Sequence, residues 1–454
     1  MSADLHQAAG ALLAGLRQSG AAAADMVGAL EALLAAQPGH DAARLALAAC
    51  LWSCRRHRDA VAQYRRLVAL HPQDARLACA LGRALVQTGG ADEGEVVLRA
   101  LAAQVPEYAE AQAWWGLALF AQRRHAQALA PLAVALALRP GERDWHMARA
   151  EALLALGRWT EGWAEHAWRW QGIRPDRLRV PAAPLIRPHP AGWNGKTVLL
   201  YAEQGHGDTL QCLRYVAPAA AAGARVVLEV QPALLRLAAA MPGVAEAVAA
   251  GGAVPPHDIA VPMFNLPWAF GTTPDYVPDA PYLSADVAAT GRWRGRLSGI
   301  AGRKIGLVWA GEPRPENLAA LATDRHRSIP LAALGPLTAV PGLAFVSLQK
   351  GAAAAQPPPP GMELHDWTAE LADFADTAAL VAALDLVISV DTGPVHLAGA
   401  LGRPTWLLNR HDTCWRWLLD RADSPWYPTL RQFRQTTPGD WAGVVARVAA
   451  ELAR

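Results

Sequence analysis

Lysine is scarce in this sequence of 454 residues, because it occurs only at positions 196, 304 and 350. Nearly all positive charge is therefore arginine, and the formal net charge is only +2. A nucleic-acid-binding protein needs a concentrated basic face that releases counterions, so this balance argues against a nucleic-acid partner. A phosphate site in this chain would have to use arginine side chains and backbone amides.

Cysteines are also few and odd in number, at positions 50, 54, 79, 212 and 414. Only the first two lie close together, and no second Cys or His pair completes a zinc pattern. A set without paired spacing favours a reduced, cytoplasmic protein over a disulfide framework.

Long hydrophobic runs and a basic leader are missing as well. No segment approaches the roughly 18 uninterrupted apolar residues of a membrane span, so we expect a protein without a transmembrane segment; peripheral membrane contact stays open. No two Asp residues are separated by a single residue anywhere in the chain. The Asp-x-Asp pattern that commonly holds a metal ion is therefore missing, and we expect no metal and no cofactor.

The first third of the chain repeats with a period of 34 residues. Pro38, Pro72, Pro106 and Pro140 are each 34 positions apart, which is the period of the tetratricopeptide helix pair. The segments between them, such as 76–87 and 93–104, have the apolar period of paired helices. Small residues keep the same register, in one column at Ala48, Gly82, Gly116 and Ala150 and in another at Ala60, Gly94, Ala128 and Gly162.

Stacked helix pairs form a superhelix whose concave face can hold an extended peptide. We therefore expect residues 1–170 to capture a protein or peptide, with a pure scaffold as the alternative. The tryptophan-rich stretch 159–170 would cap this array and pack it on the next domain; a sugar or peptide platform is the other interpretation. Residues 171–195 are rich in proline and predict a linker.

From residue 196 onward, short apolar runs alternate with helical stretches, which predicts parallel sheets covered by helices. We expect a first Rossmann-like domain over 196–300 and a second over 301–454, with a cleft between them. The expected strands are 197–201, 225–230, 259–261, 305–309, 343–348, 386–390 and 405–408. A helix is expected over about 209–222, and the tail 440–454 is expected to be a helix that packs on either half.

One loop, Gly205-His-Gly207-Asp208-Thr-Leu, follows the first expected strand. It is a poor dinucleotide fingerprint because Leu210 stands where the third glycine is needed. Asp208 could instead accept a proton from a hydroxyl in the cleft. The simpler alternative is that Asp208 only caps the following helix.

A second loop, Asp391-Thr392-Gly393-Pro-Val-His396, directly follows the apolar strand 386–390. A strand that runs at once into a helix presents backbone N–H groups where a nucleotide phosphate binds. Two alternatives remain open at this point: Asp391 caps the helix, and His396 is a core histidine.

Together the two loops resemble the signature loops of the heptosyltransferase-like glycosyltransferases, which have the glycosyltransferase-B fold. The combination with tetratricopeptide repeats resembles bacterial repeat-fused glycosyltransferases, some of which modify flagellin. The resemblance runs from about residue 196 to 441 and implies that Asp208 is the catalytic base, with Gly205 and Gly207 in its loop. It implies a donor site made of Asp391, Thr392, Gly393 and His396, of Arg327 in the motif Arg-His-Arg-Ser-Ile-Pro, and of Gln349 at a strand end.

The resemblance therefore implies an inverting, metal-independent transfer of a sugar from a nucleotide-sugar donor to a protein or peptide held by the repeats. Gln349 stands near the place where the family has an acidic ribose-binding residue, which disfavours an ADP donor. Arg327 could also be a solvated loop residue. Two other functions stay open, namely a non-catalytic adaptor with a degenerate transferase half and a transferase that acts on lipopolysaccharide or another glycan.

Overall fold

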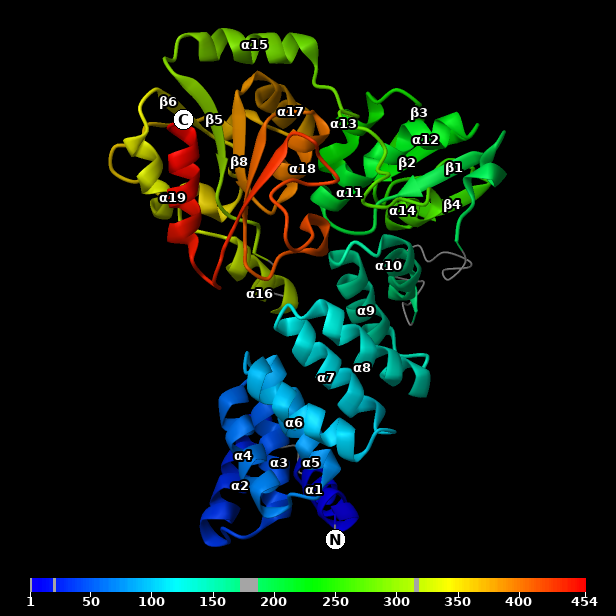
Figure 1. Ribbon diagram of the computed structural model, residues 1–454, viewed down its shortest axis with the longest axis vertical. Helices are drawn as coiled ribbons and strands as arrows, with labels where there is room; N and C mark the ends of the chain where they lie inside the picture. Colours follow the sequence, from blue (N-terminus) through cyan, green and yellow to red (C-terminus); the bar gives the residue numbers. More distant parts are fainter. Residues whose placement is uncertain (1, 19–21, 172–186, 314–317) are drawn as a thin grey trace. The chain divides into compact units, whose positions relative to one another are not determined.

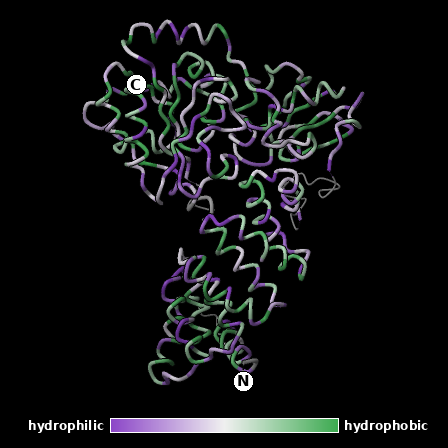
Figure 2. Tube along the Cα trace, viewed as in Figure 1, coloured by the Kyte–Doolittle hydropathy of each residue, from purple (hydrophilic) through white to green (hydrophobic). Residues whose placement is uncertain are grey.

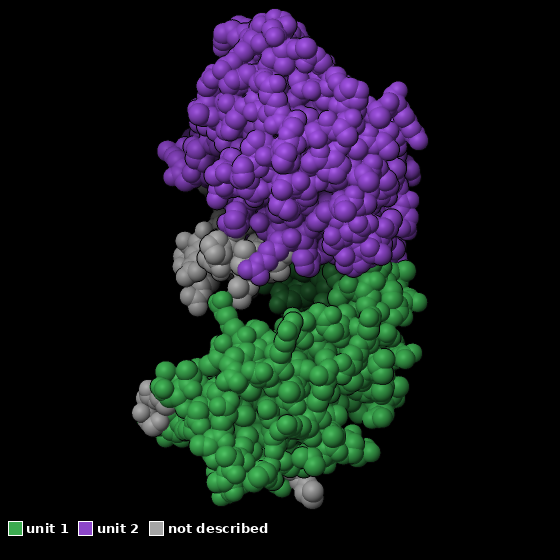
Figure 3. Space-filling model, turned by 90° about the vertical axis from the view of Figure 1, so that its left-hand side faces the viewer, with its two compact units in different colours: residues 1–153 green, residues 154–454 purple. Residues whose placement is uncertain are grey.

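The computed structural model describes residues 2–18, 22–171, 187–313 and 318–454. The chain divides into two compact units, Met1–Leu153 and Leu154–Arg454 (Figure 3). The first unit is helical and the second contains two parallel sheets (Figure 1). This architecture, helical repeats followed by α/β lobes with parallel sheets, confirms the predicted fold class.

The helices of the first unit follow the predicted repeat. The first helix of successive pairs begins at Asp41, Ala75, Ala109 and Arg143, which are 34 residues apart. In Figure 2 polar and apolar residues alternate along these helices, as expected of amphipathic elements that bury one face. The helices are α1 (Ser2–Gln18), α2 (Ala23–Ala36), α3 (Asp41–Ser53), α4 (His57–Leu70), α5 (Ala75–Gln87), α6 (Ala91–Gln104), α7 (Ala109–Ala121), α8 (His125–Leu138) and α9 (Arg143–Ala155).

The small residues of the repeat lie where paired helices cross. A Cβ atom added at Gly82 would come within 2.4 Å of Leu98 Cγ. One added at Gly116 would come within 2.6 Å of Leu132 Cγ. Because protein interiors leave no room for such an atom, these glycines set the close approach of α5 to α6 and of α7 to α8.

The tryptophan-rich stretch belongs to the second unit, which begins ahead of the boundary expected at residue 170. Helix α10 (Trp159–His166) and the 3₁₀ turn η1 (Ala167–Trp170) keep the register of the repeats, yet Trp159, Trp163 and Trp170 pack in the α/β core. Trp159 stacks on Trp426 with ring centroids 4.6 Å apart, and Trp163 meets Trp415 edge-on at 5.1 Å. Burial of these large rings explains why the unit starts at Leu154. Most of the proline-rich segment lies outside the described residues, and its end forms η2 (Pro190–Trp193).

The first lobe of the second unit is a four-stranded parallel sheet with the strand order β3-β2-β1-β4. The strand order changes direction at β1, so the loop after β1 opens at a topological switch point, where α/β folds bind ligands. The helix expected over 209–222 is broken into three pieces, with Pro218 inside the last one. The elements are β1 (Thr197–Tyr201), α11 (His206–Cys212), η3 (Leu213–Tyr215), α12 (Val216–Ala221), β2 (Arg225–Val230), η4 (Pro232–Leu234), α13 (Leu235–Ala239), β3 (Val244–Ala249), β4 (Ile259–Pro262), η5 (Met263–Asn265) and α14 (Leu266–Ala269).

The second lobe is a six-stranded parallel sheet with the order β10-β9-β8-β5-β6-β7. Its switch point lies between β5 and β8, so the loops after these strands share one edge of the sheet. The elements are β5 (Arg303–Val308), α16 (Leu318–Arg327), η6 (Leu331–Ala339), β6 (Leu343–Ser347), η7 (Ala352–Ala355), β7 (Leu364–Asp366), η8 (Thr368–Glu370), α17 (Phe374–Ala383), β8 (Leu386–Val390), α18 (Gly393–Ala400), β9 (Thr405–Asn409), η9 (Trp415–Trp417), β10 (Leu430–Arg434) and α19 (Trp441–Leu452).

Two helices outside the sheet order pack on the second lobe. The connecting helix α15 (Val287–Ser298) packs on α17 of the second lobe, although the expected boundary at residue 300 assigned it to the first. Trp293 lies 5.6 Å from Trp367 between ring centroids, and Arg296 pairs with Glu370. The C-terminal helix α19 buries its valines against the sheet of the second lobe, so the tail packs on that half.

Candidate functional site

The two signature loops meet in the second unit, one from each lobe. A Cβ atom added at Gly207 would lie 2.7 Å from His396 Cδ2 and 3.5 Å from the Cα atom of Gly393. Real Cβ atoms essentially never come within 3.0 Å of another atom, so a side chain at position 207 would force His396 to shift. The loop after β1 therefore touches the start of α18 directly.

Asp208 lies at the third position of α11 and is held from two sides. Its Oδ2 atom accepts the N–H of Gly205 at 2.8 Å, which is the backward half of a capping box. Its Oδ1 atom accepts a hydrogen bond from Nη2 of Arg416 in the second lobe. The capping alternative is therefore realised by one oxygen only, and the other faces the second lobe.

The loop that carries Asp208 is anchored by a buried ion pair. Both Glu203 oxygens accept hydrogen bonds from Arg169 at 2.8 Å, and the two side chains are only 6% and 10% exposed. Glu203 also accepts the N–H of Phe264 at 3.0 Å. Because unpaired buried charges are costly, this pair fixes the path of the chain ahead of Gly205.

The loop after β8 begins α18 without help from Asp391. Thr392 is the N-cap residue and makes no side-chain capping bond, and its hydroxyl instead donates to the carbonyl of Val390 at 3.2 Å. The alternative in which Asp391 caps the helix is therefore not realised. Pro394 has no N–H, and the Val395 N–H bonds the Thr392 carbonyl at 3.1 Å, so only part of the first turn could meet an anion.

His396 is buried, with 4% of its surface exposed. Its Nδ1 atom lies 2.9 Å from the hydroxyl of Tyr427, and its ring stacks on Trp417 at 5.3 Å between centroids. Burial lowers the pKa of His396 well below its usual range, and the charges of Arg416 and Arg214 lower it further. The imidazole is therefore neutral, and its Nδ1 atom is occupied by Tyr427. Its Cδ2–Nε2 edge faces Gly207.

Arg327 lies at the end of α16 and touches the same loop. Its Nη1 atom donates to the Asp391 carbonyl at 3.0 Å, and its Nε atom donates to Asp324 at 3.1 Å. The side chain is 19% exposed, so it is fixed rather than solvated. Arg327 and the loop 391–396 therefore form one group at the switch point of the second sheet.

Gln349 is placed differently from the prediction. Its Oε1 atom accepts the N–H groups of Trp309 and Ala310 at 3.0 and 2.9 Å, and its Nε2 atom donates to the carbonyls of Ala310 and Lys350 at 3.0 and 2.8 Å. All hydrogen-bonding positions of the amide are used. Gln349 therefore ties the ends of β5 and β6 together, and its side chain has nothing left for a ligand.

An acidic group that the sequence did not point to lies near this strand end. A Cβ atom added at Gly351, whose φ is +74°, would come within 2.2 Å of Glu312 Oε2. Glu312 follows β5, and its carboxylate lies beside Gly351. Gly351 follows β6, two residues after Gln349. Sequence spacing alone could not place it there, because β5 and β6 meet only in the folded sheet.

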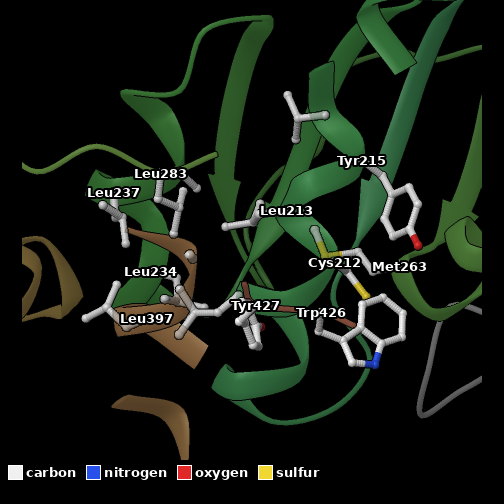
Figure 4. Packing of buried hydrophobic residues seen from close by; sticks show 14 of the residues in the cluster. Cys212, Leu213, Tyr215, Leu234, Leu237, Met263, Leu283, Leu397, Trp426 and Tyr427 are labelled. Carbon is white, nitrogen blue, oxygen red and sulfur yellow. The ribbon is translucent and has the colours of Figure 1, made fainter. Parts of the chain in front are cut away.

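Aromatic and cationic residues after β9 complete the junction between the lobes. Trp426 and Tyr427 belong to the same buried cluster as Cys212 and Leu213 of the first lobe (Figure 4). The sequence signal for this junction is the Trp-Arg-Trp run at 415–417. Trp415 meets Phe264 of the first lobe edge-on at 6.4 Å between ring centroids, whereas Trp417 stacks on His396 within the second lobe.

The first unit has its own groove, of about 790 Å³. Its lining mixes both charges with aromatic rings, including an ion pair between Arg139 and Glu110. Such a surface can hydrogen-bond an extended polar chain and also pack against its side chains. The lining includes His6, Tyr64, Arg76, Arg83, Tyr108 and Trp114.

Two features are absent from the described residues. Within residues 2–18, 22–171, 187–313 and 318–454, no three His, Cys, Asp or Glu side chains gather as a metal ion would require. Over the same ranges, none of the helices has both the length and the apolar character of a membrane span.

Comparison with known proteins adds the following. Residues 363–410 match the model of glycosyltransferase family 9 (heptosyltransferase), and residues 27–75 and 79–143 match the tetratricopeptide repeat model. The first match includes the loop 391–396 but not Asp208. Protein FlbA of Caulobacter vibrioides is 28% identical over 439 residues, which span 89% of this chain and 72% of FlbA.

Among solved structures, the glycosyl transferase family 9 from Veillonella parvula is 12% identical, covers 57% of this chain and 98% of its own, and has a TM-score of 0.42. The structure titled MamA MSR-1 C2 is 22% identical, covers 36% of this chain and 90% of its own, and has a TM-score of 0.31.

Proposed function

We propose that this chain, which joins tetratricopeptide repeats to a glycosyltransferase family 9 region, transfers a sugar from a nucleotide-sugar donor to a protein or peptide. The observation that carries this proposal is the direct contact of Gly207 with Gly393 and His396. That contact brings a loop with a carboxylate and a loop with helix-terminal amides to one place, each at the switch point of its own sheet.

The reaction needs few groups. A hydroxyl of the acceptor attacks the anomeric carbon while Asp208 takes the hydroxyl proton, and the bond from that carbon to the phosphate oxygen breaks. The nucleotide leaves with the electron pair of that bond. Attack from the side opposite to the leaving group inverts the anomeric configuration.

Negative charge develops on the phosphate as the nucleotide leaves, and the second lobe supplies groups that stabilise it. The N-terminus of α18 carries a partial positive charge of roughly +0.5. Arg327, held against the Asp391 carbonyl, adds a permanent positive charge that is partly offset by its ion pair with Asp324. No metal ion is required in this scheme.

The protein-directed part of the proposal is supported by the groove of the first unit, whose charged and aromatic lining suits a peptide. Flagellin is one acceptor of this class, as the family resemblance implies. Trp114→Ala in the full chain should weaken transfer to a protein acceptor and leave nucleotide affinity unchanged. Equal transfer to a saccharide acceptor by this variant and the wild type would favour a glycan-directed enzyme instead.

Asp208→Asn tests the proposal most simply. General bases contribute roughly 10²–10⁴-fold to rate, so kcat should fall by about that factor while nucleotide affinity stays within about twofold. Asp440→Asn is a matched control, because Asp440 caps α19 by accepting the Gly443 N–H at 2.8 Å and lies outside both loops. Turnover by Asp208→Asn at the rate of the control would refute the assignment. A wild-type chain that binds none of UDP, GDP, ADP and CMP would favour the adaptor instead.

A further inference from the structure

Arg416 is a buried cation at the junction of the two lobes. It lies in η9, and its side chain is only 11% exposed. The guanidinium carbon lies 4.3 Å from the ring centroid of Trp415 and 5.3 Å from that of Phe264. Stacking between aromatic rings leaves the edge of the planar group as its hydrogen-bonding side.

Three hydrogen bonds direct that edge. Nη2 donates to Oδ1 of Asp208, Nε donates to Oε1 of Gln211 at 2.8 Å, and Nη1 donates to Sγ of Cys414 at 3.0 Å. Asp208 and Gln211 both belong to α11 of the first lobe. A residue of the second lobe therefore makes two of its three hydrogen bonds to the helix that carries the proposed base.

This arrangement has a physical reason. Arginine keeps its charge in proteins, and a buried charge is tolerated only when it is paired and hydrogen-bonded. Asp208 is the carboxylate that hydrogen-bonds Arg416. Loss of this contact would leave a buried cation without its partner, so the pair keeps α11 against η9.

The contact also determines where the Asp208 carboxylate points. Gly205 holds Oδ2 from the first lobe at 2.8 Å, and Arg416 holds Oδ1 from the second. Each carboxylate oxygen has a second lone pair, so the group can still accept a hydroxyl proton while both bonds are kept. Its orientation is fixed by both lobes together.

We infer that Arg416 is a positioning residue for transfer, which holds Asp208 in its working orientation only when the two lobes are joined as they are here. The inference rests on the proposed function, because it assumes that Asp208 is the base. Arg416 touches neither the sugar nor the departing nucleotide in this role. It should therefore affect kcat through Asp208 and leave binding of the donor alone.

The test is a double-mutant cycle in the full chain. A base displaced by about 1 Å can lose on the order of 10²-fold in rate, so Arg416→Gln should lower kcat by at least tenfold. Nucleotide affinity, measured by calorimetry, should stay within twofold. In the Asp208→Asn background the same substitution should have no further effect on kcat, because residues that act as one unit are not additive.

Two further variants separate positioning from folding. Arg416→Lys keeps the charge and should recover part of the kcat that Arg416→Gln loses, with unchanged nucleotide affinity. Arg434→Gln is the matched control, since Arg434 also bonds the segment after β9, through the Trp417 and Leu418 carbonyls at 3.2 and 2.8 Å. It should leave kcat unchanged.

The possible outcomes distinguish the inference from the proposed function. Additive losses in the double variant, or nucleotide binding weakened tenfold by Arg416→Gln, would overturn the inference and make Arg416 a donor ligand. Unchanged kcat in Arg416→Gln would overturn it as well. A wild-type chain that neither binds a nucleotide nor transfers a sugar would instead refute the proposed function.

Discussion

Gly207→Ala offers a quantitative test of the contact between the two loops. The new methyl group would lie 2.7 Å from His396 Cδ2. The imidazole cannot move away cheaply, because Tyr427 holds its Nδ1 atom at 2.9 Å and Trp417 stacks on its ring. Overpacking of this kind costs about 1–3 kcal/mol.

Alanine also has a benefit at this position, since it is the better helix former by about 0.5–1 kcal/mol. The net expectation is a destabilisation of about 0–2.5 kcal/mol, visible in calorimetry as a fall of up to a few degrees in the melting temperature of the α/β unit. Nucleotide affinity should fall in the same variant, because the start of α18 must shift.

The control is Gly295→Ala in α15, where nothing lies within 4 Å of the added Cβ atom. That variant should gain the helix benefit of about 0.5–1 kcal/mol without a clash, and it should bind nucleotide as the wild type does. If Gly207→Ala behaved like this control in both measurements, the two loops would not touch as described, and the shared site would be refuted.

Three further predictions concern stability. Burial lowers the pKa of His125 to about 4, so as pH falls the unfolded chain takes up this proton before the folded chain does. The free energy of unfolding of the repeat unit should therefore fall by up to about 3 kcal/mol between about pH 6.5 and about pH 4. Thermal melts of His125→Phe should show a smaller fall over that window. Arg169→Met leaves the buried carboxylate of Glu203 unpaired and should cost about 3–5 kcal/mol, measured by denaturant unfolding; a loss below 1 kcal/mol would show that the pair is not buried in solution. Arg55 has a left-handed φ of 61°, a backbone conformation that is strained for any residue with a Cβ atom. Arg55→Gly should therefore stabilise the repeat unit by up to about 1 kcal/mol. A lower melting temperature in this variant would show that Arg55 is not strained.

The sequence predicted the elements that carry strong patterns. The 34-residue spacing of prolines corresponds to helices that begin 34 residues apart, and the strand expected at 386–390 is observed with the same bounds. Strand β3 was missed because its sequence, Val-Ala-Glu-Ala-Val-Ala, has little bulk and lies at a sheet edge. Strand β10 was missed because three of its five residues, Leu-Arg-Gln-Phe-Arg, are Arg or Gln and they leave no apolar run.

The residues that join the lobes could not be predicted in the same way. Asp208 and Arg416 are 208 positions apart in the chain, and no local period relates them. The role expected of Gln349 came from its place at a strand end, whereas its hydrogen bonds depend on how β5 and β6 pair. Patterns show which residues follow a strand, but the neighbours across a sheet edge follow only from tertiary packing.

A crystal structure of the donor complex would show whether the two loops form one site. We expect the phosphate nearest the sugar to lie within hydrogen-bonding distance of the Gly393 amide and Arg327, with the anomeric carbon on the side of Asp208. A nucleotide bound elsewhere, or one whose sugar faces away from Asp208, would refute the shared site.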